Sequence, residues 1–142
     1  MLWSVKLVKD GSMEYTVDNI KHPSDVIKLA RMFYLDDEPV EKFCMVALNT
    51  KNKPIGHFVV TTGIVNSSLV HPREVFQRAI LCNASSILLV HNHPSGNTKP
   101  SDDDVKITER LNNAGQILGI KVLDHIILGD DYYSFKEHGV IL

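Results

Sequence analysis

The sequence predicts an α/β domain, because strand-like and helix-like stretches alternate along the chain after Glu41. The apolar stretch 43–48 and the strand-like stretch 55–62 are joined by the turn residues 49–54, and so short a connection makes the two strands antiparallel. The chain of 142 residues has an ordinary globular composition, 44% hydrophobic and 23% charged. We therefore expect a single domain, residues 1–142, with a core that needs no disulfide support.

The residues before Glu41 are expected to form an extension of that domain. The alternating stretch 3–8, the turn residues 9–12 and the stretch 13–17 predict a β-hairpin. Ser24 is the predicted N-cap of a helix over residues 25–34. The spacing of three apolar residues predicts its buried face: Val26, Ala30 and Phe33. Residues 1–38 are thus expected to form a hairpin followed by a helix.

Two helices and three strands are expected after the antiparallel pair of strands over residues 43–62. The stretch 43–48 is continuously apolar, which predicts a strand buried on both faces. Helices are predicted from Pro72 to about Asn83 and over residues 102–118, and strands over 85–90, 122–128 and 132–135. Several apolar residues of the two helices are predicted to face the core: Val75, Ile80, Leu81, Val105, Ile107, Leu111, Ala114 and Leu118.

Composition narrows the class of protein. The net charge is −2 and the pI is about 6.4. Strong sequence-independent binding of nucleic acid needs clustered Lys and Arg residues, so DNA binding is expected to be weak or absent. Cys44 and Cys82 lie in apolar stretches and are expected to be buried thiols in a reducing compartment. The sequence has no apolar stretch that could span a membrane and no signal-peptide layout at its start, so a cytoplasmic location is expected.

The residues that carry chemistry lie within residues 91–104. Residues two apart in a strand point to the same side, so His91 and His93 can present two imidazoles together. Asp104, in the first turn of the next predicted helix, can add a carboxylate. Two histidines, one carboxylate and an open fourth position form the ligand set of a catalytic zinc ion. Ser101 and Asp104 also resemble a helix capping box, a role compatible with facing the site.

The other polar residues in or near apolar stretches are given simpler interpretations. Asp124 and His125 are expected to be structural or to support the ligands, in preference to binding the metal directly. His57 and His138 are expected at the surface, and His71 at the surface or near the cap of a helix. The helix dipole accounts for Glu74 in the first turn after Pro72.

The pattern His91-Asn92-His93-Pro94, with Ser101 eight residues after the second histidine and Asp104 three later, resembles the JAMM (MPN+) metalloprotease motif. His91 to Gly96, with Pro100, Ser101 and Asp104, is similar to the RadC version of the JAB domain. Asn92 stands where the commoner JAMM form has Ser or Thr, and this departure weakens the transfer of deubiquitinase chemistry. The resemblance implies a mixed β-sheet flanked by helices, of the JAB/MPN (cytidine deaminase-like) architecture. RadC proteins typically carry a helical N-terminal region before this domain, and because only 40 residues precede Glu41 here, that region is expected to be absent or reduced.

The resemblance also implies roles for individual residues. His91, His93 and Asp104 would bind one Zn²⁺ per chain, Glu41 would act as general base and Ser101 would stabilise the oxyanion. The expected reaction is hydrolysis of an amide or isopeptide bond in a peptide or protein substrate. Two alternatives stay open. One is a DNA-repair-associated or nuclease-like protein with another metal, and the other is a non-catalytic JAB interaction module. The oligomeric state is not predicted.

Overall fold

A five-stranded mixed β-sheet forms the centre of the molecule. The computed structural model describes residues 1–4, 18–33 and 38–142. Its strands are β1 (Lys42–Leu48), β2 (Pro54–Thr62), β3 (Ser86–Asn92), β4 (Lys121–Leu128) and β5 (Tyr132–Ser134), in the order β2-β1-β3-β4-β5. β1 runs antiparallel to β2 and to β3, β3 runs parallel to β4, and β5 is antiparallel to β4. The predicted α/β fold with a mixed sheet is confirmed.

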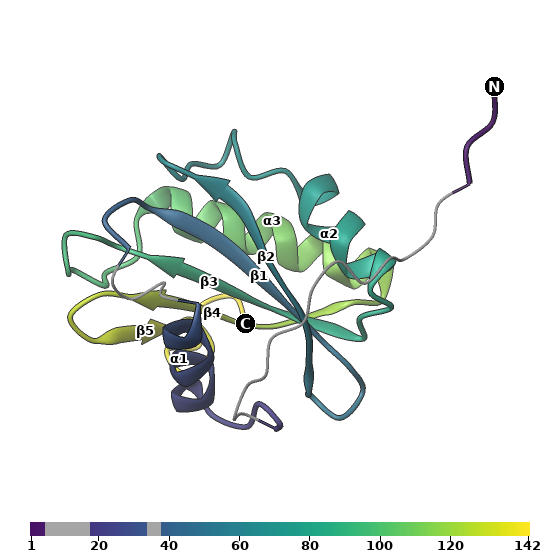
Figure 1. Ribbon diagram of the computed structural model, residues 1–142. Helices are drawn as coiled ribbons and strands as arrows, with labels where there is room; N and C mark the ends of the chain where they lie inside the picture. Colours follow the sequence, from purple (N-terminus) through teal and green to yellow (C-terminus); the bar gives the residue numbers. More distant parts are fainter. Residues whose placement is uncertain (5–17, 34–37) are drawn as a thin grey trace.

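Helices cover both faces of the sheet. α2 (Pro72–Leu81) and α3 (Asp102–Leu118) lie on one side, and α1 (Pro23–Met32) lies on the other (Figure 1). α3 forms the crossover that the parallel pair β3 and β4 requires. None of the described helices combines the length and the apolar character that crossing a bilayer requires.

The central strands are apolar on both sides because each face of the sheet has its own core. Along β1, Phe43, Met45 and Ala47 belong to the core under α2 and α3, whereas Cys44, Val46 and Leu48 belong to the core under α1. In β3 the odd-numbered Ile87 and Leu89 likewise face the α2–α3 side. His91, two residues further along β3, therefore points to the α3 side of the sheet.

The N-terminal helix begins earlier than predicted. α1 starts at Pro23 with His22 as its N-cap, so the prediction of Ser24 as the cap is wrong. The Asp25 carboxylate accepts hydrogen bonds from the backbone N–H groups of Lys21 and His22, both at 3.0 Å, which fixes this start. The helix also ends at Met32, before the expected Tyr34. The predicted hairpin over residues 3–17 lies largely outside the described residues.

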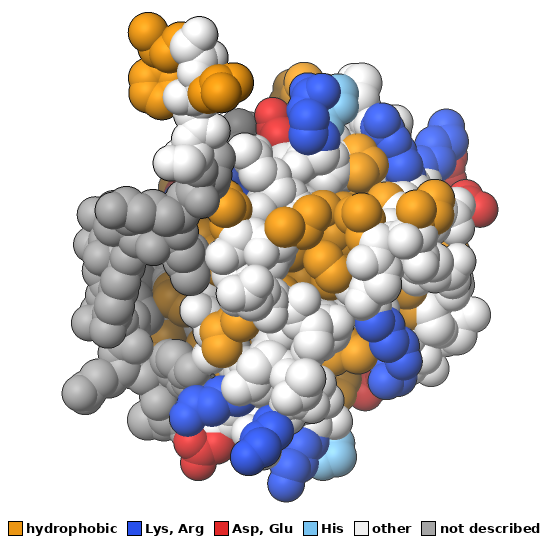
Figure 2. Space-filling model, turned by 90° about the vertical axis from the view of Figure 1, so that its right-hand side faces the viewer, with side chains coloured by type: hydrophobic (Ala, Val, Ile, Leu, Met, Phe, Trp, Pro, Cys, Tyr) orange, Lys and Arg blue, Asp and Glu red, His pale blue; other side chains and the backbone are white. Residues whose placement is uncertain are grey.

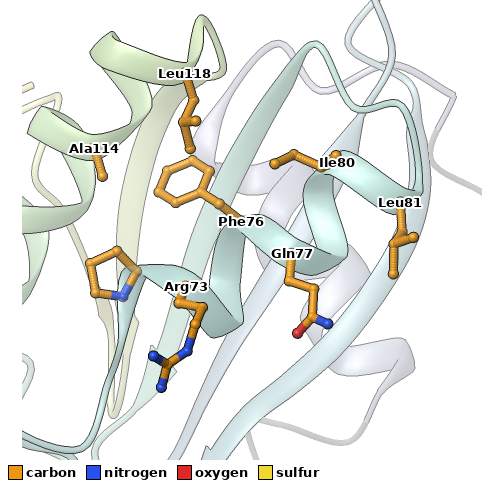
Figure 3. A pocket seen from close by; sticks show the side chains of 8 residues that line it. Arg73, Phe76, Gln77, Ile80, Leu81, Ala114 and Leu118 are labelled. Carbon is orange, nitrogen blue, oxygen red and sulfur yellow. The ribbon is translucent and has the colours of Figure 1, made fainter. Parts of the chain in front are cut away.

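A shallow apolar groove of about 500 Å³ lies between α2 and α3 (Figure 3). Ile80, Leu81 and Leu118 line it and are 53%, 36% and 48% exposed, so placing them in the core was wrong. The buried face of α2 consists of Val75, Phe76 and Ala79. Figure 2, which views the side of the molecule where α2 lies, shows hydrophobic side chains gathered in a patch. The groove contains none of the predicted site residues.

The two thiols differ in their burial. Cys44 is buried as expected, and burial raises the pKa of its thiol to about 11. Cys82 is only half-buried, because it follows α2 at the edge of the α2–α3 core. Both cysteines are free thiols.

Gly115 allows a close approach of α3 to the chain that follows it. A Cβ at this position would lie 2.4 Å from the carbonyl oxygen of Ile120 and 3.3 Å from Phe76. We expect Gly115→Ala to lower the free energy of unfolding by about 1–3 kcal/mol, although alanine favours a helix interior by about 1 kcal/mol. Gln116→Ala, on the exposed side of the same helix, should change it by less than about 0.5 kcal/mol. Urea denaturation measures both, and a Gly115→Ala protein as stable as wild type would contradict this packing.

Candidate metal centre

Two imidazoles and a carboxylate meet where β3 ends and α3 begins. Nδ1 of His91 lies 3.3 Å from Oδ1 of Asp104, and Nε2 of His93 lies 3.2 Å from Oδ2 of the same carboxylate. His91 is the penultimate residue of β3, His93 follows the strand, and Asp104 is in the first turn of α3. The structure thus brings together the three residues that the sequence predicts as metal ligands.

The surroundings of His91 fit a metal ligand better than a structural histidine. The side chain is 1% exposed, and neither ring nitrogen makes a hydrogen bond within the described part of the chain. Buried polar atoms in proteins nearly always have a partner. Ligand atoms around a tetrahedral metal ion lie about 3.3 Å apart when the bonds are about 2.0–2.1 Å long. Each of the contacts at 3.3 and 3.2 Å, which go to the two different oxygens of Asp104, has the length expected between neighbouring ligand atoms.

His93 is held in the tautomer that metal binding requires. Its Nδ1 lies 2.7 Å from the carbonyl oxygen of Asn97, so Nδ1 carries the proton and donates it to that carbonyl. Nε2 then presents its lone pair towards Asp104. A backbone carbonyl commonly orients a metal-binding histidine in this way. The contact with the Asp104 carboxylate also raises the pKa of His93, so a proton competes with a metal ion for Nε2.

Asp104 is a buried carboxylate that stays ionised. Its side chain is 1% exposed, and Oδ2 accepts a hydrogen bond from the Ser101 N–H at 2.9 Å. Burial opposes ionisation, but the contacts with His91, His93 and Ser101 outweigh it, and the pKa of Asp104 lies well below its usual range. Its position in the first turn of α3 adds the favourable end of the helix dipole.

Glu41 lies on the more open side of the cluster. Its Oε2 is 4.0 Å from Nε2 of His91 and accepts a hydrogen bond from the Val65 N–H at 3.2 Å. Glu41, His91 and His93 form a group whose ligand atoms lie within 4.8 Å of one another and could hold a metal ion. Asp104 is closer to both rings and buried, whereas the Glu41 side chain is 36% exposed. Asp104 thus lies nearer to the two rings, and Glu41 lies at the open side of the cluster.

Ser101 caps α3, and its hydroxyl group also lies at the edge of the site. Its Oγ accepts the Asp104 N–H at 3.1 Å while Asp104 accepts the Ser101 N–H, the reciprocal bonds of a capping box. The hydroxyl serves as acceptor in this bond, which leaves its own proton available for donation. The residue is exposed. Its role with an oxyanion stays a prediction.

His125 and Thr108 support Asp104 from the core. The Thr108 hydroxyl donates to the Asp104 carbonyl oxygen at 2.7 Å and lies 2.6 Å from Nδ1 of His125. Since the hydroxyl has one proton, Nδ1 of His125 carries the proton in this arrangement and donates to Thr108. His125 is 0% exposed, and burial lowers its pKa to about 3, so the ring is neutral. Sequence reasoning missed Thr108, although a polar residue on the apolar face of α3 was a signal.

The neighbouring Asp124 joins β4 to the residues after it. Oδ2 accepts the Ser134 hydroxyl at 2.6 Å, and Oδ1 accepts the backbone N–H of His125 at 2.7 Å and that of Lys136 at 3.0 Å. These bonds explain a buried carboxylate without a metal ion. Burial raises the pKa of Asp124.

Two glycines let the loop after His93 pack against the turn that follows β4. Gly96 has a φ of +85°, and its carbonyl oxygen accepts the Asp130 N–H at 2.8 Å. A Cβ on Gly129 would lie 2.4 Å from that same carbonyl oxygen. The His93 N–H in turn donates to the Leu128 carbonyl at 2.7 Å. The loop that carries His93 is therefore fixed by contacts that sequence reasoning did not find, since they join residues 33 to 35 positions apart.

The remaining histidines lie outside the cluster. His57 is half-buried instead of at the surface, because its ring stacks on that of Phe33 with the ring centroids 3.6 Å apart. Burial lowers the pKa of His57 to about 4. His138 is exposed as expected, and His71 is the N-cap of α2 without a side-chain capping bond. Glu74 lies in the first turn of α2, as predicted.

Comparison with known proteins identifies a family to which the chain is similar. The model of the RadC-like JAB domain matches residues 20–140. A UPF0758 protein of Desulfitobacterium hafniense is 50% identical over 125 residues, which cover 86% of this chain and 54% of that protein. A UPF0758 protein of Caldanaerobacter subterraneus is 53% identical over 124 residues, 85% of this chain and 52% of the relative. One from Alkaliphilus metalliredigens is 47% identical over 146 residues, 99% of this chain and 62% of the relative.

The chain spans about half the length of the first two of these relatives. The matched family model nevertheless covers most of the chain, including the strand that carries His91 and the helix that carries Asp104. The chain belongs to the RadC-like JAB domain family.

Proposed function

We propose that this chain is a zinc-dependent hydrolase of the JAMM type that cleaves an amide or isopeptide bond in a peptide or protein substrate. The observation that carries the proposal is the convergence of His91, His93 and Asp104 at 3.2–3.3 Å, with Glu41 beside them. Two imidazoles and one carboxylate suit zinc among the common metals. A zinc ion bound there would polarise a water molecule and a substrate carbonyl group at its open position.

The protein's own residues would supply the remaining steps. The Glu41 carboxylate would take a proton from the attacking water molecule and later give it to the leaving amine. The Val65 N–H, 3.2 Å from Oε2, holds that carboxylate in place. The Ser101 hydroxyl would donate to the oxyanion that develops on the substrate. Its oxygen already accepts the Asp104 N–H, so its rotation is restricted.

A nuclease that uses two metal ions is less well supported. Such a centre needs several carboxylates around both ions. Asp103 points elsewhere, because its Oδ1 accepts the hydroxyl of Ser67 at 3.0 Å, and Asp102 is exposed. Among the described residues, the group that could hold a metal has Glu41 as its single carboxylate, and Asp104 adds one more. This set suits a single ion.

We expect one equivalent of zinc per chain in protein purified without a chelator or a metal-binding tag. His91→Ala and His93→Ala should each abolish zinc binding, because each removes one of three ligands. His71→Ala is the control and should keep the metal, since His71 lies at the start of α2 outside the cluster. Elemental analysis provides the measurement. Less than about a tenth of an equivalent of any transition metal in wild-type protein would contradict the site.

Glu41→Gln should keep the fold and the zinc but lower the rate of hydrolysis about 10²–10⁴-fold, because the amide cannot accept the proton. Glu74→Gln, which removes a carboxylate from the first turn of α2, should retain most of the activity and lose at most about 1 kcal/mol of stability. Both variants are assayed on a peptide or isopeptide that a library screen with zinc-loaded protein identifies. An inactive Glu74→Gln protein with an active Glu41→Gln protein would reverse the assignment.

Binding to DNA should be weak, sensitive to salt or absent, because the chain carries a net charge of −2. Fluorescence anisotropy with labelled single-stranded and double-stranded DNA tests this at several salt concentrations. A dissociation constant below about micromolar at physiological salt would overturn the expectation and favour a DNA-associated function.

A further inference from the structure

Asn92, between the two histidines, makes contacts on the side of β3 away from the metal ligands. Its side chain is 3% exposed. Oδ1 accepts the Lys42 N–H at 2.7 Å, and Nδ2 donates to the carbonyl oxygens of Val40 at 3.0 Å and of Glu38 at 3.2 Å. The amide thus uses its acceptor and both of its donor positions on a single short segment of backbone.

This segment is the one that carries Glu41. Two of the three bonds go to the peptide groups of Val40 and Lys42, the residues on either side of Glu41. The antiparallel pairing of Phe43 with His91 brings Lys42 level with Asn92 and Glu41 level with His93. The side chain of Asn92 therefore joins the strand of the histidines to the backbone that presents Glu41.

Backbone N–H groups on the other side of Glu41 hold it as well. Its carbonyl oxygen accepts the Gly63 N–H at 2.8 Å, and its carboxylate accepts the Val65 N–H. Val65 and Gly63 lie in the connection that leaves β2, whereas Asn92 lies in β3. The Asn92 side chain thus anchors the backbone on both sides of Glu41 to the strand that supplies His91, while the Glu41 carboxylate itself lies 4.0 Å from Nε2 of His91.

We propose that Asn92 is a positioning residue that sets the distance between Glu41 and the metal ligands. The proposal rests on the proposed function, in which Glu41 acts on a ligand of the metal ion. Serine or threonine at this position has one hydroxyl group, which can donate only one hydrogen bond. An amide is needed to accept from Lys42 and donate to Val40 and Glu38 together. These three bonds give a physical reason for Asn92 at the position where the commoner JAMM form has Ser or Thr.

The experiment measures the binding of acetohydroxamate to the zinc-loaded protein by calorimetry, so no natural substrate is needed. This compound chelates zinc through two oxygens and gives its hydroxyl proton to a neighbouring carboxylate, so its affinity reports on the position of Glu41. Thiocyanate, which needs no proton acceptor, is the control ligand. Asn92→Ala removes the three hydrogen bonds, and Asn92→Asp keeps the size of the side chain and its acceptor but removes the donors.

Asn49→Ala is the matched control variant. Asn49 lies just after the other end of β1, and its Oδ1 accepts the N–H groups of Lys51 at 2.9 Å and Lys53 at 3.0 Å. This variant therefore also loses side-chain bonds to backbone, but far from Glu41. It therefore shows what the loss of such bonds does to ligand binding when they lie away from Glu41.

We expect Glu41→Gln to weaken acetohydroxamate binding at least about tenfold, the effect of losing one hydrogen bond to a charged group. Asn92→Ala and Asn92→Asp should weaken it about threefold to tenfold while zinc content and thiocyanate binding stay at the wild-type level. Asn49→Ala should change it less than about twofold. In the double variant, Glu41→Gln with Asn92→Ala should bind no more weakly than Glu41→Gln alone, because Asn92 acts through Glu41.

The outcomes separate this inference from the proposed function. If Glu41→Gln weakens binding but neither Asn92 variant does, or if Asn49→Ala weakens it equally, the role of Asn92 is wrong and the function stands. Loss of zinc from both Asn92 variants, or additive effects in the double variant, would also overturn the role of Asn92. If Glu41→Gln has no effect, the proposed role of Glu41 fails, and the inference fails with it.

Discussion

The arrangement of the site depends on the burial of one carboxylate between two imidazoles. A buried, ionised Asp104 would be very costly without compensation. Its oxygens lie 3.3 Å from His91 and 3.2 Å from His93, and the Ser101 N–H and the start of α3 add further stabilisation. A cation at the point where these groups meet would offset the negative charge of Asp104. It would also give His91 a partner, since both of its ring nitrogens lack hydrogen bonds within the described residues. We take the need to stabilise the buried Asp104 carboxylate as the reason for the arrangement of the groups around it.

The sheet places each of these groups through simple periodicity. The alternation along β3 sends His91 towards α3 and Asn92 towards the opposite side. The antiparallel register between β1 and β3 then brings Glu41 to the level of the histidines. α3, which makes the crossover between parallel strands, starts at this edge of the sheet and delivers Asp104 there. Apolar cores on both faces hold the central strands, so the site lies on rigid elements.

The sequence was informative where the signal is local. The bounds of α3 could be predicted because Ser101 and Gly119 mark its ends, and the proposed ligands fall within residues 91–104. Contacts between distant residues left no such signal, as for Asn92 with Val40 and Gly129 with Gly96. Amphipathic spacing also could not distinguish a buried face from the groove that Ile80 and Leu118 line. The start of α1 was missed because its cap is formed by Asp25 inside the helix, and not by the Ser24 that capping preferences favour.

The most direct test of the central claim is zinc K-edge X-ray absorption on the metal-loaded protein, which reports the ligand atoms without a substrate or a crystal. The account predicts a four-coordinate zinc with two imidazole nitrogens and two oxygens at about 2.0–2.1 Å. His93→Ala should remove the spectrum of this site, because it removes a ligand that lies 3.2 Å from Asp104. A spectrum with one imidazole or none, with three imidazoles, or with sulfur ligands would contradict the account.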